Sequence, residues 1–240
     1  MAFKTVFKRY ELKYMLTPEQ KNRLLRVMDA YMMPDQYGRS TIRSIYFDTP
    51  DYRLIRRSID KPVYKEKLRI RSYGEVSAES TVFVELKKKF KRVVYKRRVS
   101  LPEREAMRWI CGEEHCTLDT QITKEIDYFL DFYQSIRPSA LLSYEREAYY
   151  AKDGSDFRIT FDENVLFRQT DLSLISPVYG DPILPDGKIL MELKCSGGIP
   201  LWLAHALSDE KLYKIPFSKY GTAYKMLIFS KSNQEEFRYV

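Results

Sequence analysis

Cysteine, histidine and long apolar runs are all scarce in this chain of 240 residues. The three cysteines, Cys111, Cys116 and Cys195, cannot form a disulfide framework, and an odd number of thiols without a secretion signal is typical of a reducing compartment. No second Cys or His cluster accompanies Cys111 and Cys116, which argues against a zinc site there. No apolar run approaches the roughly 20 residues that a helix needs to span a bilayer. The sequence therefore predicts a soluble, cytoplasmic protein without a membrane span.

Charge is unevenly distributed between the two signs, with 41 Lys and Arg against 33 Asp and Glu, a formal net charge of +8. Such an excess favours an anionic partner: a phosphorylated metabolite, a nucleic acid or an acidic membrane surface. Hydrophobic residues make up 44% of the chain, and neither a Gly/Ser linker nor a low-complexity stretch divides it. The simplest prediction is one globular domain over residues 1–240.

Local patterns predict a mixed α+β fold that is rich in strands. Thr17, Pro18 and Gln20 form a capping box that predicts a helix, and Pro50 predicts a second, short one. Further helices are predicted over residues 103–111, 124–136, 201–207 and 220–230. Segments rich in Val, Ile, Tyr, Phe and Thr predict strands over residues 43–47, 65–73, 81–89, 92–101, 141–150, 157–162 and 189–194. This pattern favours an antiparallel sheet or barrel with helices outside it or at its ends.

The strands carry cations at alternate positions, and residues two apart in a strand share a face. In residues 65–73, Lys65, Lys67, Arg69 and Arg71 share one face, whereas Leu68 and Ile70 share the other. The same alternation recurs in residues 81–89 and 92–101. The tripeptide Glu-Leu-Lys occurs three times, at residues 11–13, 85–87 and 192–194, each time with both charges on one side.

Three interpretations could account for these charged faces. For a single strand, a charged face in water over an apolar core is the most frequent arrangement. A sheet closed into a barrel would turn several such faces inward, where the crowded cations require an anion such as a chain of phosphates. Nucleic-acid binding is the third and less favoured possibility, because the cations alternate with a buried face and do not form a contiguous tail.

Eight segments in order resemble one known family. ELKY, LRIRSY, VELKKK, VYKRR, SYEREAY, RITFD, MELK and FSKYG are similar to segments of the polyphosphate polymerase (VTC) domain of the vacuolar transporter chaperone complex, a triphosphate tunnel metalloenzyme. The resemblance extends from about Phe7 to Ile228. It implies a closed antiparallel β-barrel tunnel with flanking helices, a divalent cation (Mn²⁺ or Mg²⁺), and transfer of the ATP γ-phosphoryl group onto a polyphosphate chain.

The resemblance also assigns residues of this chain to roles. Lys13, Arg69, Arg71, Lys87, Arg146 and Arg158 match the bases that line the tunnel, Glu192 matches the metal-binding glutamate, and Ser218 and Lys219 match a phosphate-binding pair. Strand parity adds Lys96, Arg98 and Lys194 as possible phosphate ligands, and Tyr144 as a contact for nucleotide or phosphate. Glu11 and Glu85 are secondary candidates, either as metal ligands or as partners that orient neighbouring cations.

One departure from the wider superfamily narrows the choice of activity. The superfamily pattern Glu-x-Glu-x-Lys corresponds here to residues 9–13, where Arg9 replaces the first glutamate. This favours the polymerase branch over a two-metal triphosphatase or a cyclase. Two alternatives stay open: an inorganic triphosphatase or polyphosphatase that uses water as the acceptor, and a non-catalytic sensor of polyphosphate or nucleotide.

Overall fold

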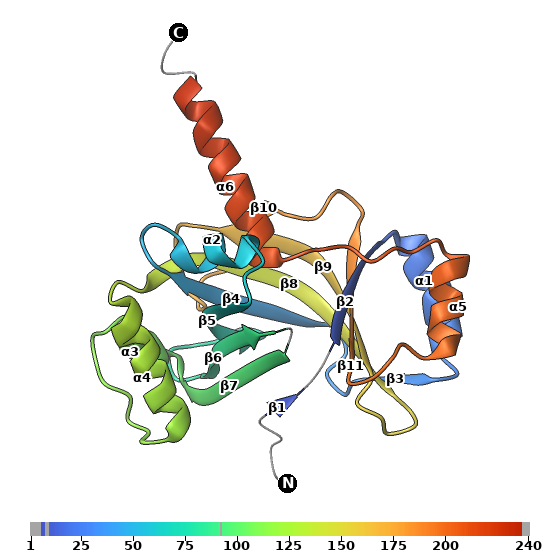
Figure 1. The fold of residues 1–240 in the computed structure, drawn as a ribbon, viewed down its shortest axis with the longest axis horizontal. Coiled ribbons are helices and arrows are strands. Elements are labelled where there is room, and N and C mark those ends of the chain that lie inside the picture. The colour runs from blue at the N-terminus through green and yellow to red at the C-terminus, as the bar shows by residue number, and fades with distance from the viewer. Residues whose placement is uncertain (1–5, 8–9, 92, 237–240) are drawn as a thin grey trace.

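A large antiparallel sheet dominates the computed structural model, which describes residues 6–7, 10–91 and 93–236 (Figure 1). Its strands are β1 (Val6–Phe7), β2 (Tyr10–Leu16), β3 (Met32–Pro34), β4 (Ser40–Asp48), β5 (Tyr64–Tyr73), β6 (Thr81–Phe90), β7 (Val93–Pro102), β8 (Arg137–Ala151), β9 (Arg158–Arg168), β10 (Asp181–Pro182) and β11 (Ile189–Cys195). The helices are α1 (Pro18–Met28), α2 (Arg53–Ile59), α3 (Glu103–Ile110), α4 (Gln121–Tyr133), α5 (Leu201–Asp209) and α6 (Lys219–Glu236).

The sheet follows the order β1-β7-β6-β5-β4-β8-β9-β11-β2, with β3 paired to β8 and β10 paired to β9. It is strongly curved, so that the β6–β7 end and the β2 end approach each other (Figure 1). An ion pair spans this approach, because Lys87 Nζ of β6 lies 2.9 Å from Glu11 Oε1 of β2. The curvature gives the sheet an outer face and an inner face.

The predicted closure into a barrel is not observed, although the α+β class and the antiparallel, tunnel-like sheet are confirmed. No hydrogen-bonded ladder joins β2 to β1 or β7 within the described residues. The N-terminal chain explains this: β1 pairs with β7 at one edge, whereas β2 pairs with β11 at the other. Consecutive pieces of one chain thus form both edges, and the two residues of β1 are too few to extend a ladder.

The outer face is apolar and is covered by helices. Leu68, Ile70, Val84 and Leu86 are fully buried beneath α3 and α4, as their alternation predicts. At the other end of the sheet, α1 and α5 cover β2 and β11 in the same way (Figure 1). Burial of each such side chain contributes roughly 1.5–3 kcal/mol, so this face fixes which residues point inward.

The helices α2 and α6 lie at one end of the inner face. They pack on Tyr46 and its neighbours through Ile55 of α2 and Tyr220 of α6. Asp48 holds both helices: its carboxylate accepts hydrogen bonds from the Leu54 and Ile55 amides at the start of α2 (2.8 and 3.0 Å) and from the Tyr220 hydroxyl (3.0 Å). A carboxylate at a helix N-terminus satisfies free N–H groups and complements the helix dipole. The start of α6 is thereby fixed beside the inner face.

Most predicted elements are present with shifted ends. The capping box of α1 is confirmed, with the Gln20 amide 3.2 Å from Thr17 Oγ1 and the Thr17 amide 2.9 Å from Gln20 Oε1. The helix after Pro50 begins only at Arg53, and β9 continues past its predicted end to Arg168. No helix in the described ranges is long and apolar enough to cross a bilayer.

Candidate functional site

The strand registers bring the predicted site residues onto one surface, because directly opposed residues of antiparallel strands point to the same side. Lys87 lies opposite both Lys67 and Lys96, and Glu85 lies opposite both Arg69 and Arg98. The charged inner face comprises Glu11 and Lys13 (β2), Tyr46 (β4), Lys65, Lys67, Arg69 and Arg71 (β5), Glu85, Lys87 and Lys89 (β6), Lys96 and Arg98 (β7), Tyr144 and Arg146 (β8), Arg158 and Asp162 (β9), and Glu192 and Lys194 (β11).

Glu85 organises the cations of β5, β6 and β7. The side chain is almost fully buried and accepts hydrogen bonds from Arg69 Nε and Arg98 Nε, both at 2.7 Å, while Lys96 Nζ lies 2.5 Å away. Burial alone would raise the pKa of Glu85, but Arg69, Arg71, Lys96 and Arg98 hold it well below its usual range. One carboxylate therefore orients three cations, which keep spare N–H groups for a ligand.

Asp162 has the same role on the opposite wall. Its fully buried carboxylate accepts a bidentate pair of hydrogen bonds from Arg146, at 2.6 and 2.7 Å, and one from Lys219 Nζ at the start of α6. Burial raises the pKa of Asp162, but Lys219 and Arg146 outweigh it and lower the value to about 2. The carboxylate is thus ionised at neutral pH and fixes both cations.

Three lysines of the inner face form no ion pair with any described residue. Lys13 Nζ donates to the Phe217 carbonyl (2.9 Å), Lys67 Nζ to Ser218 Oγ (3.2 Å), and Lys65 Nζ to the Ser58 carbonyl (3.1 Å). Burial, together with Lys13, Lys87 and Lys65, lowers the pKa of Lys67 to about 8 against the opposing influence of Tyr46.

The pKa values of Lys13 and Lys65 are lowered as well, in both cases chiefly by burial. Lys89 and Lys87 add to the effect at Lys65. Crowded ammonium groups without carboxylate partners are the arrangement that a bound polyanion would relieve.

Two carboxylates on β2 and β11 fit a divalent cation shared with phosphate. Within the described ranges, the cations that pair with Glu192 are distant, Lys194 Nζ at 3.5 Å and Arg146 Nη2 at 3.9 Å, whereas Glu11 pairs with Lys87 through both oxygens. Among the described residues, no group of three or more His, Cys, Asp or Glu could hold a metal alone. Mg²⁺ often uses one or two carboxylates together with phosphate oxygens, so Glu11 and Glu192 are the residues that could hold such a metal.

The remaining predicted residues also lie on or beside this face. Arg71 donates to Ser44 Oγ (3.3 Å) and to the Tyr144 hydroxyl (3.1 Å), and it is nearly buried. Arg158 stacks on Tyr150 with 4.2 Å between Cζ and the ring centroid, and its Nε is buried without a hydrogen-bond partner in the described part of the chain. An unsatisfied buried donor is costly, which makes Arg158 a candidate ligand for an anion.

The inner face also contains two residues that the sequence reasoning did not single out, Asp162 and Tyr46. Asp162 ends the RITFD segment and has the same strand parity as Arg158, so the alternation that identified the arginine also pointed to it. Tyr46 lies opposite Arg69 in the neighbouring strand. The sequence did not identify Tyr46 as a site residue, because an aromatic residue in a strand usually belongs to the hydrophobic core. Arg9, the departure noted above, lies outside the described residues.

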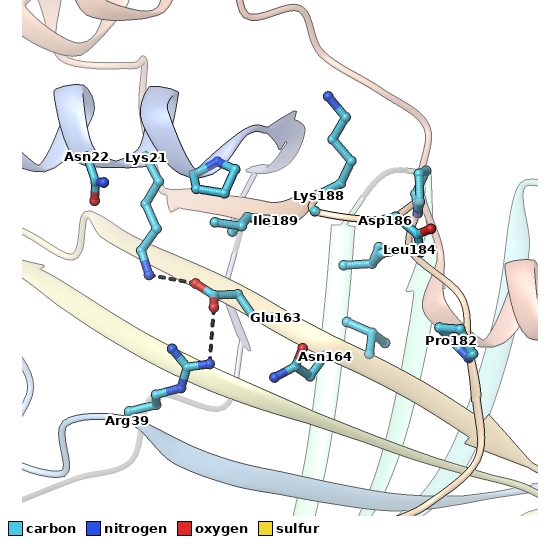
Figure 2. Close-up of a pocket in the computed structure, with 14 residues that line it drawn as sticks. Lys21, Asn22, Arg39, Glu163, Asn164, Pro182, Leu184, Asp186, Lys188 and Ile189 are labelled. Atoms are coloured by element: carbon cyan, nitrogen blue, oxygen red, sulfur yellow. Dashed lines mark hydrogen bonds and ion pairs between the residues drawn. The ribbon is translucent and has the colours of Figure 1, made fainter.

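A cavity outside the inner face does not share this chemistry. It measures about 370 Å³ and lies between α1, β9 and the chain before β11 (Figure 2). Lys21 and Arg39 both point to Glu163 in it, with nitrogen–oxygen distances of 2.7 and 3.1 Å (Figure 2). Lys21 also pairs with Glu147 at 2.9 Å. Lys21, which is buried, and Arg39, which is exposed, are thus paired with carboxylates, unlike Lys13 and Lys67.

The curved antiparallel sheet with its charged inner face is similar to the sheet of tunnel-fold proteins. Residues 8–228 match the VTC domain family, and the chain belongs to that family. Its fold is similar to that of a candidate adenylate cyclase from Bacillus halodurans, with a TM-score of 0.56 and 15% identity over 90% of this chain and 96% of the other. It is also similar to a candidate adenylyl cyclase from Hippeastrum described as having a dominant triphosphatase activity, with a TM-score of 0.53 and 14% identity over 88% and 92%. No curated protein sequence matches the chain significantly.

Proposed function

We propose that this protein is a metal-dependent polyphosphate polymerase, which transfers the γ-phosphoryl group of ATP onto a polyphosphate chain at the inner face. The observation that carries the proposal is a set of inner-face lysines that form no ion pair with any described residue, Lys13, Lys65 and Lys67, on the same face as the oriented cations around Glu85 and Asp162. A single phosphate needs fewer cations than this. A chain of phosphates matches a set of them.

The proposed roles follow from the contacts. Arg69, Arg71, Arg146 and Arg158 bind and orient phosphates, because a guanidinium presents a fork of N–H donors that matches phosphate oxygens. Lys96, Arg98, Tyr144, Lys194 and Ser218 extend this set of substrate contacts. Phosphoryl transfer needs positioning and charge neutralisation more than a protein nucleophile, so none is assigned.

Lys13, Lys87 and Lys219 would neutralise charge on the group that is transferred. The pKa values of Lys13 and Glu192 are both lowered, so the glutamate is ionised at neutral pH whereas the lysine sheds its proton more readily than usual. Mn²⁺ or Mg²⁺ held by Glu192, with Glu11 as the second carboxylate, would supply further positive charge at the phosphate oxygens. The preference between these two metals depends on coordination by the substrate as well as by the protein.

The test is incubation of the purified protein with ATP and Mn²⁺ or Mg²⁺, followed by electrophoresis for polyphosphate and an assay of released orthophosphate. We expect long polyphosphate, and we expect Glu192→Gln to lower its rate of formation by about 100-fold or more, since several kcal/mol of charge stabilisation are lost. Glu125→Gln, on the outer surface, is the matched control and should leave the rate unchanged.

The outcomes separate the proposal from its alternatives. Release of orthophosphate without polymer would replace the polymerase by a triphosphatase that uses water as acceptor. Tight binding of tripolyphosphate without turnover under either metal would indicate a sensor. Failure of tripolyphosphate to bind at all would overturn the assignment of the inner face as a polyanion site.

A further inference from the structure

Tyr46 is a titratable group on the inner face that phosphoryl transfer, as proposed above, does not use. Its ring stacks on that of Tyr220 from α6, with 4.7 Å between centroids and 18° between planes. Tyr220 is held in turn by its hydrogen bond to Asp48. The ring of Tyr46 is therefore held in place by Tyr220, and its hydroxyl lies beside the β5 cation Arg69.

Arg69 contacts the hydroxyl directly, and Arg71 and Lys67 act on it electrostatically. Arg69 Nη1 donates to Tyr46 Oη at 2.9 Å, and Arg69 Cζ lies 5.7 Å from the ring centroid. Burial alone would raise the pKa of Tyr46, but Arg69, Arg71 and Lys67 overcome it and lower the value to about 7. Because Arg69 already donates to this oxygen, the phenol proton is directed away from Arg69 or is absent.

Groups from the other elements do not offset these cations at Tyr46. Glu85 of β6 is shared among Arg69 and the two cations of β7. Tyr144 of β8 accepts a hydrogen bond from Arg71 and lies beneath Lys219 of α6, with Nζ 4.4 Å from the ring centroid. Tyr46 is thus an anion beside the β5 cations that a proton converts to a neutral donor near neutral pH. Tyr73 of β5 is a second phenol whose pKa is lowered against burial by Arg71 and Arg98, and Arg98 Nη2 donates to it at 3.2 Å.

We propose that Tyr46 is a substrate-contacting residue that couples polyanion binding to proton uptake. Without ligand and above about pH 7, the phenol is ionised and serves as an internal counter-anion for Lys67, Arg69 and Arg71. When a polyphosphate chain binds, its oxygens take over those cations, and Tyr46 accepts one proton from solvent. The neutral hydroxyl then donates to a phosphate oxygen where a phenolate would repel it. This inference rests on the proposed function only in taking the ligand to be a polyphosphate.

Polyanion binding and protonation of Tyr46 favour each other. A bound polyanion raises the pKa of Tyr46, so binding takes up a proton at pH values above about 7. Affinity for polyphosphate should therefore fall as the pH rises through that value, by up to tenfold per pH unit for one linked proton. Below about pH 7 the phenol is already protonated, and its contribution to the pH dependence disappears.

The test uses the near-ultraviolet absorption band of tyrosinate, which needs no turnover. The full chain is titrated from about one pH unit below to one above 7, with and without inorganic tripolyphosphate, and EDTA is present to remove metal. Tyr46→Phe keeps the ring that stacks on Tyr220 while removing the hydroxyl. Tyr149→Phe is the matched control, because burial and Glu147 raise the pKa of Tyr149 to about 12 and keep its phenol neutral.

We expect the wild type and Tyr149→Phe to show one tyrosinate near pH 7 to 8 that tripolyphosphate abolishes, and Tyr46→Phe to lack it. A tyrosinate band that persists in Tyr46→Phe, or that tripolyphosphate leaves unchanged while calorimetry records binding, would overturn the inference. Absence of a tyrosinate band in the wild type over this pH range would also overturn the inference, whatever the variants show. Absence of tripolyphosphate binding would instead overturn the proposed function, and this inference with it.

Discussion

Asp162→Asn should destabilise the protein in the absence of ligand, and the structure gives the magnitude. Arg146 and Lys219 lower the pKa of the buried Asp162 carboxyl from 3.8 to about 2. At about 1.4 kcal/mol per pKa unit, this difference corresponds to a contribution of about 2 kcal/mol to the free energy of unfolding. Because the native pKa is the lower one, the contribution is complete above about pH 4 and is lost as the pH falls through about 2.

Asparagine keeps the shape of Asp162 but removes the close counter-anion of both Arg146 and Lys219, so that Arg146 keeps only the Glu192 carboxylate, 3.9 Å away, among the described residues. Breaking a buried pair by removing one partner typically costs about 3–5 kcal/mol, so urea unfolding at neutral pH should show a loss of at least about 2 kcal/mol. Tripolyphosphate should restore more stability to the variant than to the wild type, because it can occupy the two freed cations.

The control for Asp162→Asn is Glu125→Gln, which removes a partly exposed partner of Arg97 on the outer face. Such exposed pairs contribute about 0–1 kcal/mol. An Asp162→Asn variant that loses no more stability than Glu125→Gln, or that tripolyphosphate does not rescue preferentially, would show that the Asp162 cluster does not hold the inner face together.

Two further results are expected. Lys89→Gln should weaken binding of long polyphosphate about two- to tenfold more than Lys88→Gln, because Lys89 points to the inner face whereas Lys88 points to the outer face and approaches Glu125. Calorimetry at several salt concentrations measures the difference, and equal effects of the two substitutions would contradict binding of the polyphosphate chain along the inner face. Arg168→Gln should expose residues 171–179 to limited proteolysis, because Arg168 donates to four backbone carbonyls of that loop at 3.0 to 3.2 Å; an unchanged cleavage pattern would show that this loop is held by other contacts.

The composition of the inner face was largely predictable because strand parity is a local property. Once Leu68 and Ile70 are taken as buried, Arg69 and Arg71 must lie on the opposite side, and the structure has both pairs as expected. The contacts between strands were not predictable in the same way. Nothing local to Glu85 indicates that its partners come from β5 and β7, because those contacts depend on the register between strands.

Barrel closure and the titration of Tyr46 depend on long-range geometry, which is why closure was predicted wrongly and the titration was not predicted at all. A closed barrel follows from an inward charged face only if the edges pair, and here β1 and β2 leave the edges unpaired within the described residues. Tyr46 resembles any core tyrosine in sequence, and its distinct chemistry arises from Lys67, Arg69 and Arg71 on a neighbouring strand. The roles of the predicted site residues in binding and turnover stay predictions.

The seam between β6 and β2 has a consequence for how a long polymer reaches the site. If a continuous hydrogen-bonded ladder closed the sheet, a polymer could enter its interior only by one of its ends. An ion pair of Lys87 with Glu11, whose side chains are 35% and 29% exposed, crosses this seam. Opening that ion pair costs about 1 kcal/mol or less. The ion pair therefore resists separation of β6 from β2 only weakly, so within the described residues the room available to a bound polymer at this point is not fixed by a hydrogen-bonded ladder.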